Sequence, residues 1–336
     1  MTDSVREAAV AAIAAATGPD AFVEAVDAAC AAVPAHRIDA SAAADWWSGI
    51  VRASVAGAAR LIGPPTGVDW QWFVTGSCGR REGLPGADVE TLVVFAGDEA
   101  HGPQVRTAAA HVHDLLERAG LPPDGNGAIA SRARCCRTAE QWSAVIDEWA
   151  QHPEIDRGVV MAGLTLDASA VDEGGGPDVD LAAEMRAAAA AHPQLARAMA
   201  QDCSAVREAV PARLSVLTRR ADSVDVKRAI LDPIVRLARL RAVLDGAGVQ
   251  STHGRLSVAG AALPQIDWAA LARAHVEGTS IRWSLRRDGW PDRRLSSDLV
   301  PLRDLAPHDR ARVRSAGREV LGAQRVLRYV ALEETR

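Results

Sequence analysis

Two short groups of residues in the first third of the chain have the types and spacing of a site for chemistry. One is the pair Gly76-Ser77, and the other is Asp88 and Glu90, with ten residues between Ser77 and Asp88. A Gly-Ser turn carries no bulky side chain, so its main-chain N–H groups and its hydroxyl can approach a phosphate. Residues two apart on a strand point to the same face, so Asp88 and Glu90 would project together while Val89 faces the core.

Two carboxylates held side by side repel each other unless a cation lies between them. Mg²⁺ binds in this manner, through one or two carboxylates and the phosphates of a substrate. The pattern therefore predicts metal-assisted nucleotidyl transfer, an in-line displacement at a phosphate. Arg80 and Arg81, between the two groups, would neutralise a triphosphate or the departing pyrophosphate. The alternative remains open that the turn is an ordinary one and the acidic pair only a solvated face.

Such a site needs a strand on either side of it, and the local sequence predicts both. WQWFVT, residues 70–75, is aromatic and β-branched, and DVETLVVFA, residues 88–96, is apolar behind its acidic start. Residues 3–62 have helical spacing. Further helices are expected over residues 103–119 and from Thr138, an N-cap with Gln141 at the capping-box position.

The remainder of the chain is expected to be helical after one more strand, VVMAGLTLDA at residues 159–168. From Leu181 onward no strand is expected, and Pro233 should kink its helix because the helical pattern resumes on both sides. We therefore expect an α+β, mostly helical protein in which a small sheet flanked by helices precedes a helical bundle. The expected divisions are a helical segment (1–65), an α/β domain (66–185) and a C-terminal helical domain (186–336).

Composition excludes several classes of protein. The 336 residues are 48% hydrophobic, which excludes a disordered chain, and no stretch approaches the ~20 apolar residues of a membrane span. With 38 Lys and Arg against 43 Asp and Glu, the chain has a net charge of −5, which disfavours tight nonspecific binding to the phosphates of a nucleic acid. Five scattered cysteines without a CxxC pair indicate reduced thiols in a cytoplasmic protein.

The segment GSCGRREGLPGADVE resembles the signature of the DNA polymerase β-type nucleotidyltransferase superfamily. More narrowly, GSxGRxE followed by DxE resembles a family of bacterial nucleotidyltransferases that is similar to the N-terminal domain of protein-PII uridylyltransferase and is often fused to CBS domains. The resemblance continues through VDVKRAILDPIVRLARLRAVLDGAGVQSTHGRL into the family's helical C-terminal domain, and it spans roughly residues 35–335. No CBS domain is therefore expected. The residues that carry the second part are Asp225, Lys227, Thr252, Arg255 and Leu256.

The resemblance implies a polymerase-β-type fold, an NTP substrate, Mg²⁺ or Mn²⁺ as cofactor, and a role for each matching residue. Catalysis and metal binding would belong to Asp88, Glu90 and a third acid, Asp167. Nucleotide binding would belong to Gly76, Ser77, Gly79, Arg80 and Arg81. Accessory roles are open for Glu82, Lys227 and Arg255: Lys227 is either an ion-pair partner of Asp225 or catalytic, and Arg255 either anchors helices or reaches the cleft.

Three positions depart from the family pattern. Ala87 replaces a Thr or Ser, Glu90 replaces the more usual Asp, and Ser169 stands where an Asp-x-Arg motif would have its Arg. The first hypothesis is an enzyme that moves an NMP group to a hydroxyl of a protein or small-molecule acceptor, with a regulatory role. The second is a nucleotide-binding regulator or scaffold that transfers nothing, and the third is a structural module whose pocket binds no nucleotide.

Overall fold

The computed structural model describes residues 2–171, 176–211, 222–293 and 297–333. The chain forms two compact units. Unit 1 comprises Met1–Glu148 and Leu164–Met185, and unit 2 comprises Trp149–Gly163 and Arg186–Arg336. Unit 1 therefore contains both the expected N-terminal helices and most of the expected α/β domain. No helix in the described ranges has the length and apolar character needed to cross a membrane.

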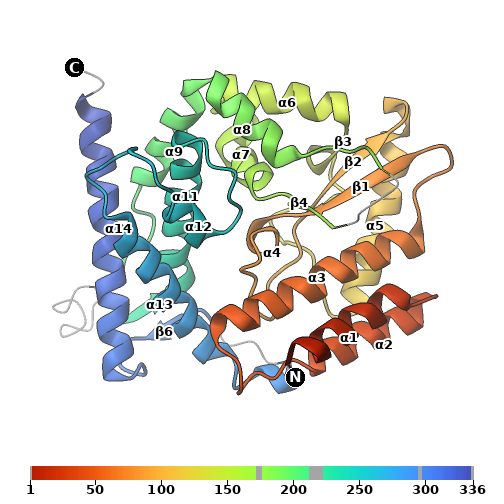
Figure 1. Cartoon of the computed structure of the whole chain (residues 1–336), viewed down its shortest axis with the longest axis horizontal. Coiled ribbons are helices and arrows are strands. Elements are labelled where there is room, and N and C mark those ends of the chain that lie inside the picture. The colour runs from red at the N-terminus through yellow and green to blue at the C-terminus, as the bar shows by residue number, and fades with distance from the viewer. Residues whose placement is uncertain (1, 172–175, 212–221, 294–296, 334–336) are drawn as a thin grey trace. The chain divides into compact units, whose positions relative to one another are not determined.

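Three N-terminal helices form one layer of unit 1: α1 (Thr2–Ala15), α2 (Pro19–Ala31) and α3 (Ala40–Ile62). Helix α3 begins where the Asp39 carboxylate accepts a 2.8 Å hydrogen bond from the N–H of Ala42, and it ends at Gly63, whose φ of 73° breaks the helix. Helix α3 contacts α1, α2 and the sheet, so it lies between the other two helices and the strands (Figure 1).

The sheet of unit 1 has the order β3-β2-β1-β4. Strands β1 (Asp69–Val74) and β2 (Thr91–Ala96) are antiparallel, β3 (Cys136–Thr138) is parallel to β2, and β4 (Ser169–Ala170) is antiparallel to β1. The central strands are buried on both faces because helices cover them; on β1, Trp70 and Trp72 meet edge to face, with ring centroids 5.4 Å apart. The two strands predicted around the Gly-Ser turn are thus present, but β2 begins at Thr91, after the acidic pair that the prediction placed on it.

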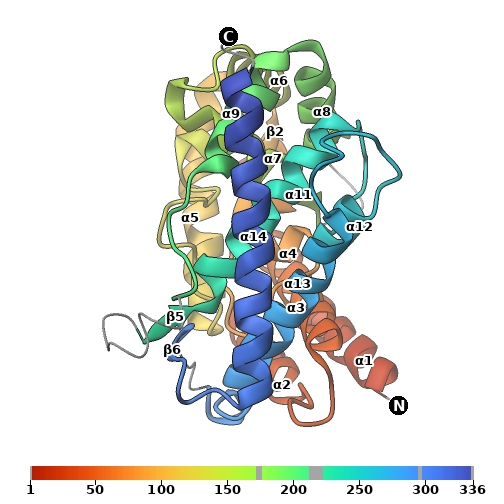
Figure 2. The ribbon, with the colours of Figure 1, turned by 90° about the vertical axis from the view of Figure 1, so that its left-hand side faces the viewer.

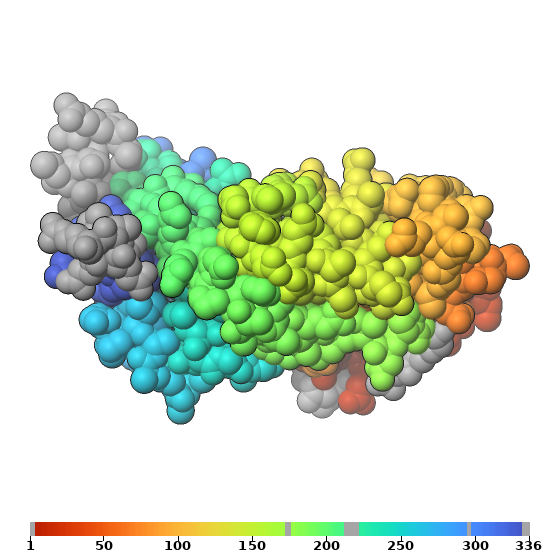
Figure 3. All heavy atoms as spheres, turned by 90° about the horizontal axis from the view of Figure 1, so that it is seen from above, coloured from red at the N-terminus to blue at the C-terminus, as the bar shows by residue number. Residues whose placement is uncertain are grey.

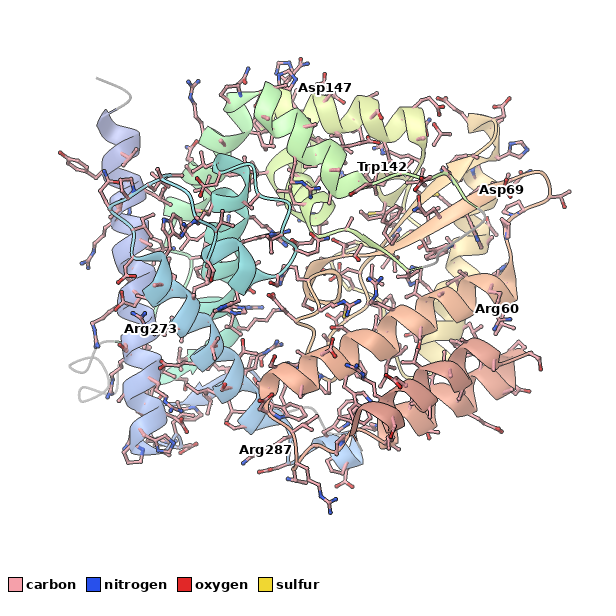
Figure 4. The ribbon with its side chains drawn as sticks, viewed as in Figure 1. Arg60, Asp69, Trp142, Asp147, Arg273 and Arg287 are labelled. Carbon is pink, nitrogen blue, oxygen red and sulfur yellow. The ribbon has the colours of Figure 1, made fainter. Side chains whose placement is uncertain are left out.

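The other helices of unit 1 follow the sequence in part. Helix α5 (Gly102–Arg118) matches its prediction, and α6 (Ala139–Gln151) begins with the predicted capping box. In that box the Thr138 hydroxyl accepts from the Gln141 N–H at 3.2 Å, and Gln141 Oε1 accepts from the Thr138 N–H at 3.1 Å. The side chain of Trp142 points from α6 toward the sheet, and its Nε1 donates to the carbonyl of Val93 in β2 at 2.9 Å (Figure 4).

The third predicted strand is wrong. Most of VVMAGLTLDA forms a helix, α7 (Gly158–Leu166), and only the two residues of β4 after Asp167 and Ala168 are extended. A short apolar run buried on several sides has no periodicity to separate helix from strand. Helix α8 (Leu181–Ala191) follows, and Glu184 at its start accepts a 2.9 Å hydrogen bond from Ser143 of α6; Figure 3 shows these two helices meeting on one face.

Unit 2 is mainly a helical bundle. Its long C-terminal helix runs along α9 and α13 (Figure 2). The helices are α9 (Pro193–Ser204), α11 (Asp232–Leu244), α12 (Thr252–Leu256), α13 (Trp268–Arg286) and α14 (Pro307–Glu333). The expectation of no strand beyond Leu181 is wrong, because β5 (Ser223–Asp225) and β6 (Leu299–Pro301) form a two-stranded antiparallel sheet.

Pro233 lies in the first turn of α11, where its missing N–H costs least. A π-helical turn, η4 (Lys227–Leu231), leads directly into it. At the position of the expected kink the helix therefore changes from π-helical to α-helical hydrogen bonding, and the π-helical turn accommodates the proline. Four single-turn 3₁₀ helices complete the described elements: Glu99–His101, Ala133–Cys135, Ile155–Arg157 and Trp290–Asp292.

Candidate functional site

The Gly-Ser turn follows directly from the end of β1. Residues Gly76–Gly79 form a single helical turn, α4, whose start at Thr75 is tied down by a hydrogen bond from the Thr75 hydroxyl to the carbonyl of Leu164. Gly76 has a φ of 57°, which a residue with a side chain rarely adopts. Within the described chain, the main-chain N–H groups of Gly76, Ser77 and Cys78 have no acceptor, as expected for the first turn of a helix.

The acidic segment is held in an extended conformation from both sides. On one side the carbonyl of Glu90 accepts a 3.0 Å hydrogen bond from the Thr75 N–H. On the other side the Val89 N–H donates to the carbonyl of Pro122 at 2.9 Å, and the Val89 carbonyl accepts from the Asp124 N–H at 3.1 Å. Val89 is fully buried, Asp88 is exposed and Glu90 is half-buried, which is the alternation predicted for a carboxylate pair on one face.

The structure brings the carboxylate of Glu90 onto the Gly-Ser turn. A Cβ placed on Gly76 would lie 1.5 Å from Glu90 Oε2, so the carboxylate occupies the space that any side chain at position 76 would need. Asp88 forms no ion pair or hydrogen bond with any residue in the described part of the chain. The turn, one acid against it and one acid exposed beside it therefore form a single site.

The two neighbouring arginines of the loop differ: Arg81 is exposed to solvent, and Arg80 is not. It is buried, its Nη1 pairs with Asp167 Oδ2, and its Nε donates to Glu82 Oε2 at 2.8 Å. Burial alone would disfavour the charge, but the carboxylates of Asp167 and Glu82 outweigh burial and raise the pKa of Arg80 above its usual value. Arg80 therefore serves as the counter-ion of two carboxylates.

Asp167, the expected third acid, is fully buried in this ion pair. Gly79 packs against its backbone: a Cβ on Gly79 would lie 2.0 Å from the Asp167 carbonyl oxygen. Among the residues that the structure describes, no three His, Cys, Asp or Glu side chains are grouped so that they could hold a metal ion. Asp88 and Glu90 are near the turn, while the carboxylate of Asp167 is held by Arg80; its role as a metal ligand stays a prediction.

Arg52 of α3 is a residue of this site that sequence reasoning missed. Its Nη1 donates to Ser169 Oγ at 2.9 Å and its Nη2 donates to the carbonyl of Ala170. A guanidinium group thus reaches Ser169, where the family pattern would place an arginine side chain. The only signal in the sequence was a single charge at the edge of an apolar helical stripe, which usually marks a solvated position.

The thiol of Cys78 lies within this site. Burial, aided by the negative charge of Glu90, raises the pKa of Cys78 to about 12, so the thiol is neutral near pH 7. No disulfide joins any of the five cysteines, and all five are buried. The expectation of reduced thiols fits these surroundings.

The two accessory residues of unit 2 have different surroundings. Lys227 is exposed, and the expected ion pair with Asp225 does not form, because Asp225 accepts from the Arg228 N–H at 2.9 Å and lies 3.7 Å from Arg228 Nε. Arg255 is buried, and its Nε donates to the carbonyl of Val249 at 2.9 Å. The contacts of Arg255 favour the anchoring role over a role in binding.

Two family models match the chain. The first, described as "Putative nucleotidyltransferase DUF294", matches residues 24–156. The second, described as "Putative nucleotidyltransferase substrate binding domain", matches residues 193–331. No curated protein matches the chain. The first match contains the Gly-Ser turn and the acidic pair, and the second lies within the helical region of unit 2.

Proposed function

Because the chain belongs to the nucleotidyltransferase family whose two models it matches, we propose that the site in unit 1 transfers a nucleoside monophosphate from an NTP to a hydroxyl acceptor. The acceptor oxygen bonds to the α-phosphorus, the bond from that phosphorus to the bridging oxygen of the β-phosphate breaks, and pyrophosphate leaves with the electron pair. The hydroxyl proton passes to water. The observation that carries the proposal is the contact of the Glu90 carboxylate with Gly76 beside the exposed Asp88.

Phosphate binding is assigned to the turn. The N–H groups of Gly76, Ser77 and Cys78 have no acceptor within the described residues, and successive main-chain N–H groups in a turn form an anion-binding concavity. Gly76 supports this role by its lack of a side chain, since any Cβ would displace Glu90. Ser77 is half-buried, and its hydroxyl adds a donor next to these groups.

Mg²⁺, or Mn²⁺, fits the donor chemistry of the acidic pair. Two carboxylates on one face of an extended segment, one of them with no partner in the described chain, supply the oxygen ligands that these cations prefer. When bound, the cation would neutralise phosphate charge during the displacement. Asp88 and Glu90 would hold it, and Asp167 enters this ligand set only if Arg80 releases it.

The acceptor is proposed to be a protein or a small molecule, because the chain carries a net charge of −5 and would repel a polynucleotide. The match of unit 2 to a substrate-binding description supports binding of the acceptor by the helical bundle. A uridylyltransferase-like specificity, a regulatory role and a cytoplasmic location are part of the same proposal.

The test is a thermal melt of the full chain with each of the four NTPs, with and without Mg²⁺, followed by an assay for pyrophosphate release. Binding at 100 times Kd should stabilise the fold by roughly 2.7 kcal/mol. We expect a Mg²⁺-dependent shift that disappears in Asp88→Asn. The matched control is Asp69→Asn, at the opposite end of β1 and exposed, which should keep the shift (Figure 4). The absence of a shift with every NTP would refute the proposal.

One observation favours a second function, a regulator that binds NTP and transfers nothing. The buried ion pair of Arg80 with Asp167 leaves two carboxylates near the turn, those of Asp88 and Glu90, that are not already held by Arg80. This alternative predicts the same Mg²⁺-dependent shift in the melt but no pyrophosphate release with any acceptor fraction.

A further inference from the structure

Arg52 has a guanidinium group that the proposed reaction does not yet use. Its hydrogen bonds to Ser169 Oγ and to the Ala170 carbonyl fix the group at β4, and Ser169 pairs with Val74, the last residue of β1 before the turn. Both acceptors are neutral, so neither bond cancels the positive charge. Of the five N–H donors of an arginine, these two bonds leave three for another partner.

No carboxylate offsets the charge of Arg52 within the described ranges of the chain. Its titratable neighbours are the guanidinium of Arg81, which is charged, and the thiol of Cys78, which is neutral near pH 7. Burial first, and the repulsion from Arg81 second, lower the pKa of Arg52. A half-buried cation beside a second cation is costly, and an anion between or beside them removes that cost.

Arg81 is the second cation. Its side chain is 67% exposed, and its backbone is left-handed with a φ of 60°. Its ion pair with Asp45 is long, at 3.8 Å, and Asp45 also pairs with Arg6. Arg80, in contrast, is held by Asp167. Of the arginines around the turn, Arg52 and Arg81 therefore keep charge that a ligand can use.

We propose that Arg52, together with Arg81, binds the β- and γ-phosphates of the NTP and stabilises the departing pyrophosphate. This inference rests on the proposed function of the same site. The planar fork of Arg52 suits two phosphate oxygens at once, and its anchoring to β4 orients the fork before the ligand arrives. A nucleoside monophosphate lacks the phosphates that these arginines bind, so its affinity should not depend on them.

The test measures Kd by calorimetry in the presence of Mg²⁺ for three probes: tripolyphosphate, which has no base, the NTP found by the melt, and the corresponding NMP. In Arg52→Gln we expect tripolyphosphate and NTP to bind at least tenfold more weakly, and NMP to change less than twofold. The matched control is Arg60→Gln on the same helix. Arg60 also donates to main-chain carbonyls, those of Ala14 and Ala16, but lies eight residues along α3, or about 12 Å (Figure 4). It should change none of the three affinities.

Several outcomes would overturn the proposal or its premise. Tight tripolyphosphate binding by Arg52→Gln, or an equal loss for NMP and NTP, would overturn the role of Arg52. If wild type binds NTP and Asp88→Asn does not, the proposed function stands, and either of these outcomes for Arg52→Gln refutes only the role of Arg52. If wild type binds no NTP, the proposed function itself fails. If Arg52→Gln does not fold, the exposed Arg81→Gln tests the same site, and unchanged tripolyphosphate binding there overturns the proposal.

Discussion

Asp167 has two candidate roles: the predicted one of a metal ligand, and that of counter-ion to the buried Arg80, with which it forms an ion pair. In Asp167→Asn the buried Arg80 loses one of its two carboxylate partners and keeps Glu82, whose oxygen lies 2.8 Å from Arg80 Nε. Breaking a buried ion pair by removing one partner costs about 3–5 kcal/mol. Because Glu82 remains, we expect the lower end, about 3 kcal/mol. For a unit of this size each kcal/mol lowers the Tm by roughly 2–4 °C, so the expected loss is roughly 6–12 °C.

The comparison variant is Asp88→Asn. Asp88 is exposed and has no partner in the described chain, so its replacement should change stability by no more than about 0.5 kcal/mol. The assay is thermal unfolding of both variants without ligand, then with Mg²⁺ and NTP. We expect Asp167→Asn to melt lower and still respond to Mg²⁺ and NTP, and Asp88→Asn to melt like wild type and not respond. The reasoning is refuted if Asp167→Asn melts like wild type yet loses the response, because Asp167 would then be a ligand rather than a counter-ion.

Three further predictions concern single positions. Gly76→Ala should abolish the Mg²⁺-dependent NTP shift, because the new Cβ would meet the Glu90 carboxylate; calorimetry that finds NTP binding unchanged would contradict this contact. Burial lowers the pKa of His113 to about 4 in the folded state, against about 6.5 in the unfolded chain. The contribution of His113 to the free energy of unfolding is therefore fully present above pH 6.5 and is lost as the pH falls toward 4. Urea unfolding should show about 2 kcal/mol of this loss between pH 7 and pH 5, absent in His113→Gln; an equal loss in both proteins would exclude His113 as its source. Thr138→Ala should cost about 1 kcal/mol by removing the capping box of α6, and an unchanged urea midpoint would show that the cap contributes nothing.

Local patterns predicted what depends on neighbours in the sequence. The strand before the turn, the alternation around Val89 and the capping box at Thr138 all follow from spacing within a few residues. Trp72 and Trp142 lie in apolar segments of the sequence, and both are fully buried in the core. The α+β, mostly helical fold is confirmed on the same basis.

Features that depend on distant residues could not be predicted in this way. The ion pair of Arg80 joins residues 87 positions apart, and the contact of Arg52 with Ser169 joins residues 117 apart. In neither contact do the residues next to one partner in the sequence indicate which distant residue it will meet. The helix α7 was missed because an apolar run buried on several sides suits both kinds of element, and the three-residue strands β5 and β6 are too short to show alternation.

The discontinuity of unit 1 has a consequence for the order in which the protein matures on the ribosome. Residues 1–148 emerge first, but Asp167 and β4 belong to the returning segment Leu164–Met185, which emerges after a stretch assigned to unit 2. Domains generally fold as units during synthesis, at about 5–20 residues per second. Until Asp167 emerges, the buried position of Arg80 lacks one of its two carboxylates. A nascent chain from which residue 164 has not yet emerged should therefore remain sensitive to protease at the Gly-Ser turn, and one from which residue 185 has emerged should become resistant.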